Sequence, residues 1–246
     1  MMARSSKAEV WDELAPGYDD LRLGDAVYRA GLYQAIEVLR PSGVVLDAGC
    51  GTGLATRLLL GCSEIRALDF SKRSLEVLEQ RIGRRRNLKP VHGDLCALPF
   101  PDETFDSVLC ANAFPCLSPV TQACAASELR RVLKPHGRYA VSVHSYSRAK
   151  RRKRWVKEGR PGQAGVDYIF RYSRTELLRL FPGSHIRAVG FYALPGRVQI
   201  TAARYFGELV DKLGFGHMLI AYGSKDEERR LSNSRESVVS GAVASD

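Results

Sequence analysis

The chain has 246 residues, of which 45% are hydrophobic and 26% are charged, and its formal net charge is +10. That length can bury the core of one medium-sized domain. The sequence lacks an apolar run of the roughly 18 residues that a membrane span needs, and its first residues lack the apolar region of a secretory signal. These features predict one principal, cytoplasmic domain without a membrane-spanning helix.

Six cysteines lie between positions 50 and 124. They form no CxxC pair and show none of the Cys/His spacings that are typical of a zinc site. We therefore expect reduced thiols, most of them in the core, and no bound metal.

From about residue 44 the chain alternates short β-rich runs with helical patterns, which is typical of βαβ units and a parallel sheet. Two later runs, around 185–193 and 217–223, add a sixth and a seventh strand. The predicted fold is therefore α/β, a Rossmann-like doubly wound sheet of seven strands with helices on both faces. The first five strands are predicted at 44–50, 65–70, 88–94, 105–112 and 138–145.

Capping residues mark the helix ends between these strands. Ser71 can cap a helix that Gly83 terminates. A second helix begins near Ser118 and stops within 134–137, where Pro and Gly interrupt the pattern. The segment 173–176, Ser-Arg-Thr-Glu, is a capping box that opens a short third helix.

A Gly-rich turn at 49–53 follows the first predicted strand and leads into a helical pattern. Missing side chains at such a turn let the backbone approach a ligand, and the free N–H groups of the following helix face it. The dinucleotide fingerprint requires glycine or alanine at position 54, where this chain has Leu54. The turn therefore predicts a ligand site and disfavours NAD or FAD.

Acidic residues accompany the first three predicted strands. Asp47 lies in the first strand, Asp69 ends the second and Asp94 ends the third. A doubly wound fold places a carboxylate at the position of Asp69 to accept hydrogen bonds from a ribose. Three acids at one edge of the sheet suit the hydroxyls, amine and N–H₂ group of a nucleoside better than they suit phosphates.

The ordered segments DAGCGTG, ALDFS, GDLCALPFPDETFDSVLCANA and LRRVLKPHGRYAVSV resemble the successive motifs of class I S-adenosyl-methionine-dependent methyltransferases of the type 11 or UbiE-like group. The resemblance covers about residues 8–225 and implies S-adenosyl-methionine as the cofactor and methyl transfer as the reaction. It also implies the strand order 3-2-1-4-5-7-6, with an antiparallel seventh strand.

By this resemblance the glycines of the turn line the methionine part of the cofactor, and Asp69 holds the ribose. Asp94 and Leu95 would lie at the adenine. The structural alternative is that the turn is only a tight connection and that Asp69 only caps the next helix. The full set of cofactor-binding residues that we expect is Asp47, Ala48, Gly49, Cys50, Gly51, Gly53, Asp69, Phe70, Asp94, Leu95, Ala111 and Asn112.

The predicted methyltransferase domain spans residues 1–225 and is followed by a polar, disordered tail at 226–246. Within it we expect N-terminal lid helices at 1–40 and a basic substrate-side insertion at 146–172. Acceptor contacts should come from these segments and from loops beyond the carboxyl ends of the strands.

Two residues are candidates for a catalytic role. Tyr18, in the segment WDELAPGYDDL, resembles part of the family's amphipathic entry segment, with a packing aromatic as its alternative role. His144 ends the fifth predicted strand and is the candidate base, with a surface or structural histidine as the alternative. Further candidates for substrate contacts are Phe114, Tyr146, Tyr192 and Arg197.

The stretch 148–160 holds eight cations, one acid and Trp155, and it bears on the acceptor. A solvated loop beside a small-molecule pocket is the favoured interpretation. One alternative is an RNA methyltransferase that binds tRNA or rRNA through this strip. Another is a lipid-linked acceptor at an anionic membrane, with the apolar segment 198–213 as a second contact. A cofactor-binding module without transferase activity is a fourth possibility.

Overall fold

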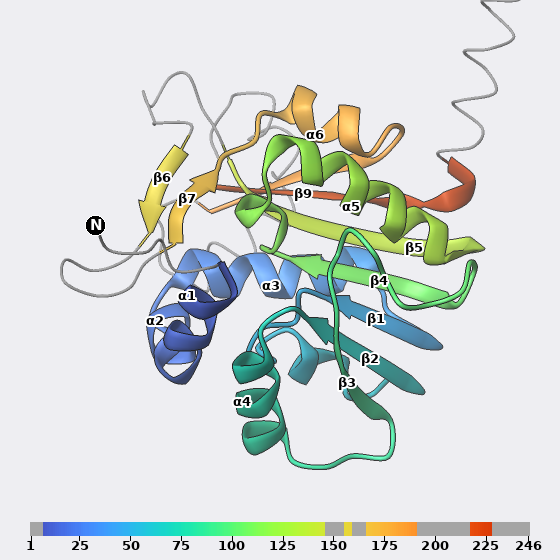
Figure 1. Cartoon of the computed structure of the whole chain (residues 1–246). Coiled ribbons are helices and arrows are strands. Elements are labelled where there is room, and N and C mark those ends of the chain that lie inside the picture. The colour runs from blue at the N-terminus through green and yellow to red at the C-terminus, as the bar shows by residue number, and fades with distance from the viewer. Residues whose placement is uncertain (1–6, 146–154, 159–165, 191–216, 228–246) are drawn as a thin grey trace, which may run out of the picture.

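A computed structural model of the chain describes residues 7–145, 155–158, 166–190 and 217–227 (Figure 1). Seven strands form one sheet in the order β3-β2-β1-β4-β5-β9-β8. β9 runs antiparallel to both of its neighbours, and the other pairings in the sheet are parallel. The predicted Rossmann-like order and the antiparallel seventh strand are confirmed. The strands are β1 (Val44–Ala48), β2 (Glu64–Asp69), β3 (Leu88–His92), β4 (Phe105–Ala111), β5 (Leu133–His144), β8 (His185–Val189) and β9 (Met218–Ser224).

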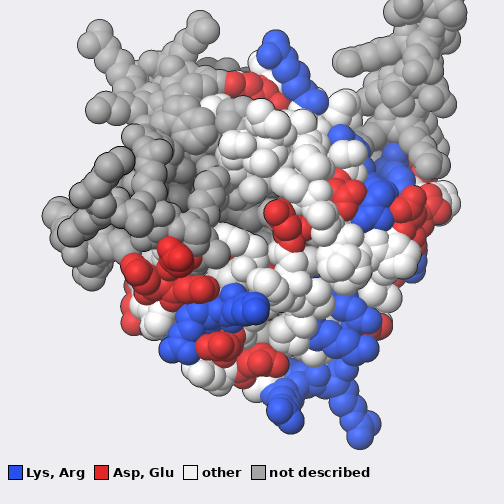
Figure 2. All heavy atoms as spheres, in the orientation of Figure 1, with Lys and Arg blue, Asp and Glu red and all other residues white. Residues whose placement is uncertain are grey.

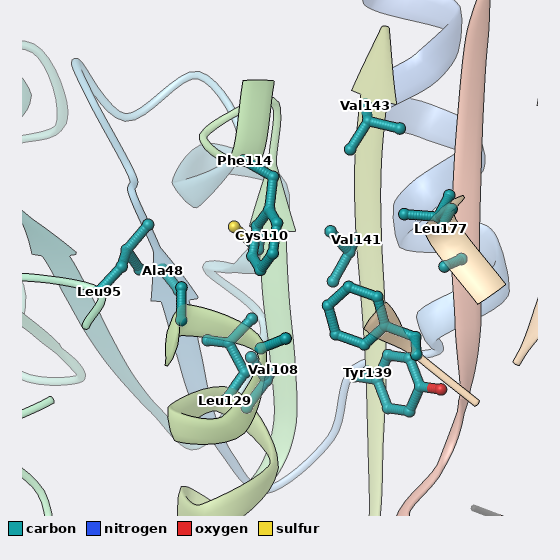
Figure 3. Packing of buried hydrophobic residues seen from close by; sticks show 14 of the residues in the cluster. Ala48, Leu95, Val108, Cys110, Phe114, Leu129, Tyr139, Val141, Val143 and Leu177 are labelled. Atoms are coloured by element: carbon teal, nitrogen blue, oxygen red, sulfur yellow. The ribbon is translucent and has the colours of Figure 1, made fainter. Parts of the chain in front are cut away.

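Helices cover both faces of the sheet. Alternate strand residues point to opposite faces, so Val45 packs on the side of α3 and α4, whereas Leu46 packs on the side of α5. Two hydrophobic clusters result, one in each interlayer, and Figure 3 shows part of the α5 side. The helices that form these layers are α3 (Ala26–Leu39), α4 (Lys72–Ile82), α5 (Pro119–Val132) and α6 (Arg174–Leu180).

The predicted helix caps are present. The Ser71 side chain accepts a hydrogen bond from the Ser74 N–H at 3.0 Å, and Gly83 ends α4 with a positive φ of 75°. Ser118 caps α5, and Ser173 forms the predicted capping box with Glu176. Each side chain satisfies a backbone donor that the first turn leaves free.

Two helical segments differ from the prediction. The helical pattern after the Gly-rich turn forms only a short 3-10 helix, η2 (Thr56–Leu59). The second predicted helix ends at Val132, and the segment 134–137 belongs to β5. The reason is tertiary, because Leu133 pairs with Phe105 of β4 and an irregularity in register accommodates the extra residues before the regular ladder begins.

The N-terminal segment divides between two roles. α1 (Lys7–Leu14), η1 (Ala15–Gly17) and α2 (Tyr18–Leu23) lie near the carboxyl ends of the parallel strands (Figure 1). α3 contacts β4, β5 and β9, so this part of the predicted lid segment is a core helix. No helix in the described part of the chain is long and apolar enough to cross a membrane.

A separate two-stranded ribbon lies beyond the end of β5. Its strands are β6 (Trp155–Glu158) and β7 (Val166–Phe170), which pair in antiparallel fashion. β7 contacts η3 (Phe114–Cys116) and α1. Tyr172 follows β7, and its hydroxyl donates a hydrogen bond to the Phe114 carbonyl at 3.1 Å. The β6–β7 ribbon is thus anchored to the main fold near the carboxyl edge of the sheet.

Candidate functional site

A cavity of about 360 Å³ lies where the carboxyl ends of β1, β2, β3 and β4 meet the N-terminal helices. Its volume is within the range of roughly 300–1,000 Å³ that is usual for small-molecule sites. The residues that line it are Trp11, Ala15, Tyr18, Tyr28, Gly49, Cys50, Gly51, Thr52, Leu54, Ala55, Leu68, Asp69, Phe70, Ser74, Gly93, Asp94, Leu95, Cys96, Ala111, Asn112, Ala113, Cys116, Leu117 and Thr121.

The Gly-rich turn forms one wall of this cavity. The N–H groups of Gly49 and Cys50 both donate to the Leu68 carbonyl, at 2.8 and 2.9 Å, which fixes the turn to the end of β2. Gly49 has a φ of 75°, and a Cβ atom there would lie 2.4 Å from the Cβ of Ala113. Gly51 also has a positive φ but faces open space. Glycine is therefore required at 49 for both conformation and close approach.

Three residues of the predicted cofactor set lie behind this wall and do not line the cavity. A Cβ atom on Gly53 would lie 2.9 Å from the Leu78 Cγ, so this glycine lets the turn pack against α4. Ala48 is fully buried in the hydrophobic core, and Asp47 is also fully buried. These three residues would support ligand binding by holding the turn in place. The resemblance implies that they contact the cofactor directly.

Asp69 is buried at the end of β2 and lines the cavity. Its carboxylate accepts hydrogen bonds from the N–H groups of Gly51 at 2.8 Å and Ser71 at 2.9 Å. Burial raises the pKa of Asp69 above its ordinary value, and these donors oppose the rise. Asp69 thus holds the Gly-rich turn, accepts a hydrogen bond at the start of α4 and also faces the cavity. The ligand-binding role and the capping role expected from the sequence are therefore compatible.

Asp47 is an unusual buried acid beneath the turn. One carboxyl oxygen accepts a hydrogen bond from the Thr56 hydroxyl at 2.6 Å, and the other has no partner in the described structure. Burial raises the pKa of Asp47 to about 7, and the nearby Asp69 carboxylate adds to the rise. A positive charge bound above the turn would favour the ionised form of this carboxyl.

The residues that follow β2 and β3 contribute a further part of the cavity wall. Asp94 is exposed, and its carboxylate accepts a hydrogen bond from the Cys96 N–H at 2.8 Å. Leu95 is buried, and Phe70 lines the cavity with 38% of its surface exposed. An acceptor of hydrogen bonds next to two apolar side chains suits a flat heterocycle that carries an N–H₂ group.

Asn112 follows β4 and has an unusual environment. Its φ of 61° is a left-handed conformation that asparagine tolerates better than most residues. Both side-chain polar atoms are buried, and neither has a hydrogen-bond partner among the described residues. Because buried amides in native proteins are usually paired, this one indicates a ligand that supplies the missing bonds.

Aromatic residues from the N-terminal segment form the opposite wall. Tyr18 lines the cavity as predicted, and its ring packs edge-on against Trp11 at 5.8 Å between centroids. Tyr28 also lines the cavity and shares a side-chain hydrogen bond with Tyr18. The guanidinium of Arg22 lies over both tyrosine rings, 5.2 and 5.4 Å from their centroids. Burial raises the pKa of Tyr28, so its hydroxyl stays protonated.

Asp19 connects this aromatic wall to the Gly-rich turn. Its side chain is almost fully buried, accepts a hydrogen bond from the Thr52 hydroxyl and forms an ion pair with Arg81 of α4. The Arg57 guanidinium lies 3.9 Å from the same carboxylate. Arg81 also donates to the Pro16 carbonyl at 3.1 Å. Of the neighbouring residues Tyr18 and Asp19, the tyrosine therefore lines the cavity. The aspartate forms the contacts that hold the N-terminal segment in place.

Two of the other acceptor-side candidates, His144 and Phe114, do not line the cavity. His144 is half-buried at the end of β5, where its carbonyl accepts a hydrogen bond from the Tyr172 N–H, and it is not among the lining residues. Phe114 is fully buried against Phe181 and beside Cys110 (Figure 3), so it is a core residue rather than a substrate contact. The remaining candidates, Tyr146, Tyr192 and Arg197, lie outside the described residues, as does most of the stretch 148–160.

Several lining residues were not predicted. Tyr28 belongs to a helix whose apolar pattern resembles that of any core helix, so no local signal distinguishes it. Cys96 and Thr52 lie within two positions of the predicted residues Asp94 and Gly51. Their place in the sequence could therefore have predicted that they line the cavity. Leu117 and Thr121 reach the cavity only because α5 begins next to it.

The charge of the cavity is negative. Asp69 and Asp94 line it, and none of the lining residues is Lys or Arg. On the face of the molecule shown in Figure 2, acidic and basic side chains are interspersed, with several Lys and Arg at the lower edge. In the described residues no group of three or more His, Cys, Asp or Glu side chains could hold a metal. The cavity therefore suits a ligand with positive charge and disfavours phosphates.

Comparison with known sequences finds a family match in the central part of the chain. Residues 46–141 match the family described as methyltransferase domain. The chain is 36% identical over 108 residues to squalene methyltransferase 1 of Botryococcus braunii, covering 42% of this chain and 28% of that protein. It is 37% identical over 102 residues to demethylmenaquinone methyltransferase of Bacillus licheniformis, covering 39% and 43%. The chain thus spans less than half the length of these curated relatives.

Solved structures share the fold over most of the chain. The DhpI–SAH complex has a TM-score of 0.61 at 18% identity and covers 88% of this chain and 93% of that one. A 1,6-didemethyltoxoflavin-N1-methyltransferase of Burkholderia thailandensis, solved with S-adenosylhomocysteine, has a TM-score of 0.59 at 18% identity, with coverage of 91% and 92%. At these identities the likeness shows the fold, which agrees with the predicted architecture.

Proposed function

We propose that this chain, whose residues 46–141 belong to the methyltransferase domain family, is an S-adenosyl-methionine-dependent methyltransferase that acts on a small molecule. The relation to class I methyltransferases predicted from the ordered motifs is confirmed by the family match, and S-adenosyl-methionine is the cofactor of that class. The activity of the whole chain and the nature of its acceptor are the proposal.

The observation that carries the proposal is the composition of the cavity. Its wall joins the Gly-rich turn, Asp69 and Asp94 at one edge of the sheet, and no Lys or Arg lines it. A nucleoside that carries a sulfonium and an amine matches this negative wall, whereas a dinucleotide pyrophosphate does not. The unpaired amide of Asn112 indicates that a polar ligand belongs in this space.

When bound, S-adenosyl-methionine supplies a methyl group on a positively charged sulfur. The protein has to hold the acceptor atom in line with that methyl and to exclude water. Its contribution to the rate is therefore mainly the orientation of the two reactants. In this proposal Asp69 binds the ribose hydroxyls and Asp94 accepts a hydrogen bond from the adenine, since both residues line the cavity. We assign the orientation of the acceptor to the Asn112 amide and to the Tyr18 and Tyr28 hydroxyls, which also line the cavity.

The N-terminal wall supports a small-molecule acceptor. Trp11, Tyr18 and Tyr28 confine the cavity with aromatic surface and bring no cation into it. A polyanionic acceptor would be expected to meet Lys and Arg at the reacting site. The named relatives, squalene and demethylmenaquinone methyltransferases among them, carry names of small-molecule acceptors.

Calorimetry tests the cofactor part of the proposal. We expect the chain to bind S-adenosyl-methionine and its demethylated product, and we expect Asp69→Ala to weaken binding about 100-fold through the loss of two charge-assisted hydrogen bonds. Asp102→Ala is the matched control, because that carboxylate pairs with Arg131 on the exposed surface. Failure of the folded wild-type chain to bind either compound would overturn the proposal.

Turnover with candidate small molecules tests the activity and the acceptor. Methyl transfer above the level of Asp69→Ala separates an enzyme from an inert binding module. Methylation of tRNA or rRNA that is salt-sensitive and weakened by the triple change Arg151→Ala, Arg152→Ala and Arg154→Ala would instead favour the RNA interpretation. Sedimentation with anionic vesicles and not with uncharged ones would favour a lipid-linked acceptor.

A further inference from the structure

Two cysteines from distant parts of the chain meet beside the cavity. Cys96 follows Asp94 and lines the cavity, and Cys124 lies one turn after Thr121 on α5, where it is exposed. The Cys96 thiol donates to the Thr121 carbonyl at 3.4 Å, and the Cys124 thiol donates to the Cys96 carbonyl at 3.2 Å. The two thiols also lie close enough to interact with each other electrostatically. They are therefore within reach of each other without a large backbone movement.

We propose that Cys96 and Cys124 form a modification site, in which a peroxide converts the two thiols to a disulfide that weakens cofactor binding. The site lies outside the groups assigned to methyl transfer. Its formation is independent of the proposed function, whereas its effect on the cofactor rests on that function.

The exposure of the two sulfurs decides the order of the chemistry. Burial and the Asp94 carboxylate raise the pKa of Cys96 to about 11, so this residue stays a thiol near neutral pH. Cys124 is the exposed thiol of the pair, and a dissolved oxidant therefore meets it first.

The reaction takes two steps and consumes one peroxide. The Cys124 thiolate attacks a peroxide oxygen, the O–O bond breaks, and a sulfenic acid and one water form. The Cys96 sulfur then attacks the Cys124 sulfur and the S–O bond breaks. The proton of Cys96 joins the departing hydroxide as a second water, and the disulfide remains.

The disulfide would act on the cavity because its two residues belong to two parts of the wall. Leu95 and Cys96 line the cavity on the loop after β3, and Thr121 lines it on α5. A bonded S–S distance of about 2.05 Å is much shorter than any non-bonded contact of two sulfurs. The loop is therefore drawn toward α5, and Asp94 and Leu95 move from the positions that face the ligand.

Peptide mapping after treatment with hydrogen peroxide tests the site. We expect the wild-type chain to lose two hydrogen atoms and to give a linked pair of peptides that contain Cys96 and Cys124. Cys62→Ser is the matched control, because this half-buried thiol lies away from the cavity, and the variant should form the same link. Oxidation of Cys124 to a sulfinic acid without the link, or a link to another cysteine, would overturn the proposal.

Calorimetry with S-adenosylhomocysteine before and after oxidation tests the consequence. The Kd of the wild-type chain should rise roughly tenfold on oxidation and recover with dithiothreitol. Cys124→Ser, which changes an exposed residue, should keep its affinity in both conditions. A link without a change in affinity would overturn the coupling to the cofactor. Absence of binding by the reduced chain would refute the proposed function, while the mapping would still decide the modification.

Discussion

The two walls of the cavity are held in different ways. In the strand-end wall, formed by the Gly-rich turn, Asp69 and Asp94, backbone hydrogen bonds such as Gly49 N–H to the Leu68 carbonyl fix the geometry. In the N-terminal wall, formed by Trp11, Tyr18 and Tyr28, the position depends on side chains that meet distant residues, as Asp19 meets Arg81. We infer that the strand-end wall is preformed. The N-terminal wall should lose its fixed position when the charge of Asp19 is removed.

The largest expected effect concerns Asp47, beneath the strand-end wall. In the native state its carboxyl keeps a proton up to about pH 7, whereas in the unfolded chain it loses the proton near pH 4. The native state therefore binds more protons in this window, and the free energy of unfolding falls as pH rises from about 4 to 7, by at most about 4 kcal/mol. Denaturant titrations at several pH values measure this fall.

Asp47→Asn should remove most of that pH dependence, because the amide stays neutral and can still accept the Thr56 hydrogen bond. Asp20→Asn is the control, since Asp20 is an exposed carboxylate on α2 and should keep the wild-type slope. The carboxylates whose pKa is lowered, Glu64, Asp106 and Glu128, lose their contribution only at lower pH. Equal slopes in wild type and Asp47→Asn would contradict the prediction.

The next effect addresses the N-terminal wall. Asp19→Ala leaves Arg81 without its carboxylate partner and should lower the free energy of unfolding by about 3 kcal/mol, the lower end for a broken buried pair because the Arg81 side chain is partly exposed. The KM for the cofactor should rise together with the loss of stability. A double-mutant cycle with Arg81→Met measures the coupling between the two side chains. Additive effects of the two changes would show that the pair does not hold the wall.

Gly49→Ala tests whether the strand-end wall depends on backbone conformation. The positive φ and the 2.4 Å approach to Ala113 should together cost about 2 kcal/mol and narrow the cavity. Gly51→Ala has the same unfavourable positive φ but no close contact, so its free energy of unfolding should fall by about half as much as that of Gly49→Ala. Gly61→Ala, which has no neighbour within 4 Å, is the control in chemical denaturation. Similar losses for all three would argue against a preformed wall.

The smallest expected effect concerns the anchor of the β6–β7 ribbon. Tyr172→Phe removes the hydrogen bond to the Phe114 carbonyl and should cost about 1 kcal/mol. That carbonyl keeps its bond from the Leu117 N–H, so it is not left unpaired. Tyr33→Phe, at a half-exposed tyrosine, is the control in thermal unfolding. A stability equal to that of the control would exclude this hydroxyl as an anchor.

The sequence was a good guide where function depends on neighbours along the chain. The carboxylate of Asp94 and the caps Ser71 and Ser173 accept hydrogen bonds from backbone N–H groups two or three residues away, so local patterns were enough for them. The turn at 49–53 and Asp69 meet at the ends of two neighbouring strands, which the βαβ pattern predicts. Prediction was weaker where contacts are long-range. Phe114 was expected at the substrate and is in the core, and Tyr28 was not distinguished from other core residues although it lines the cavity.

The amino-acid order by itself determined the sheet and most of the strand-end wall, because strand alternation and glycine conformation are properties of short segments. The tertiary structure decided the length of the helix after the turn, the end of α5 and the role of Asp19. These depend on which distant side chains arrive at the same place, such as Arg81 at Asp19 or Cys124 at Cys96, and no local pattern encodes that meeting.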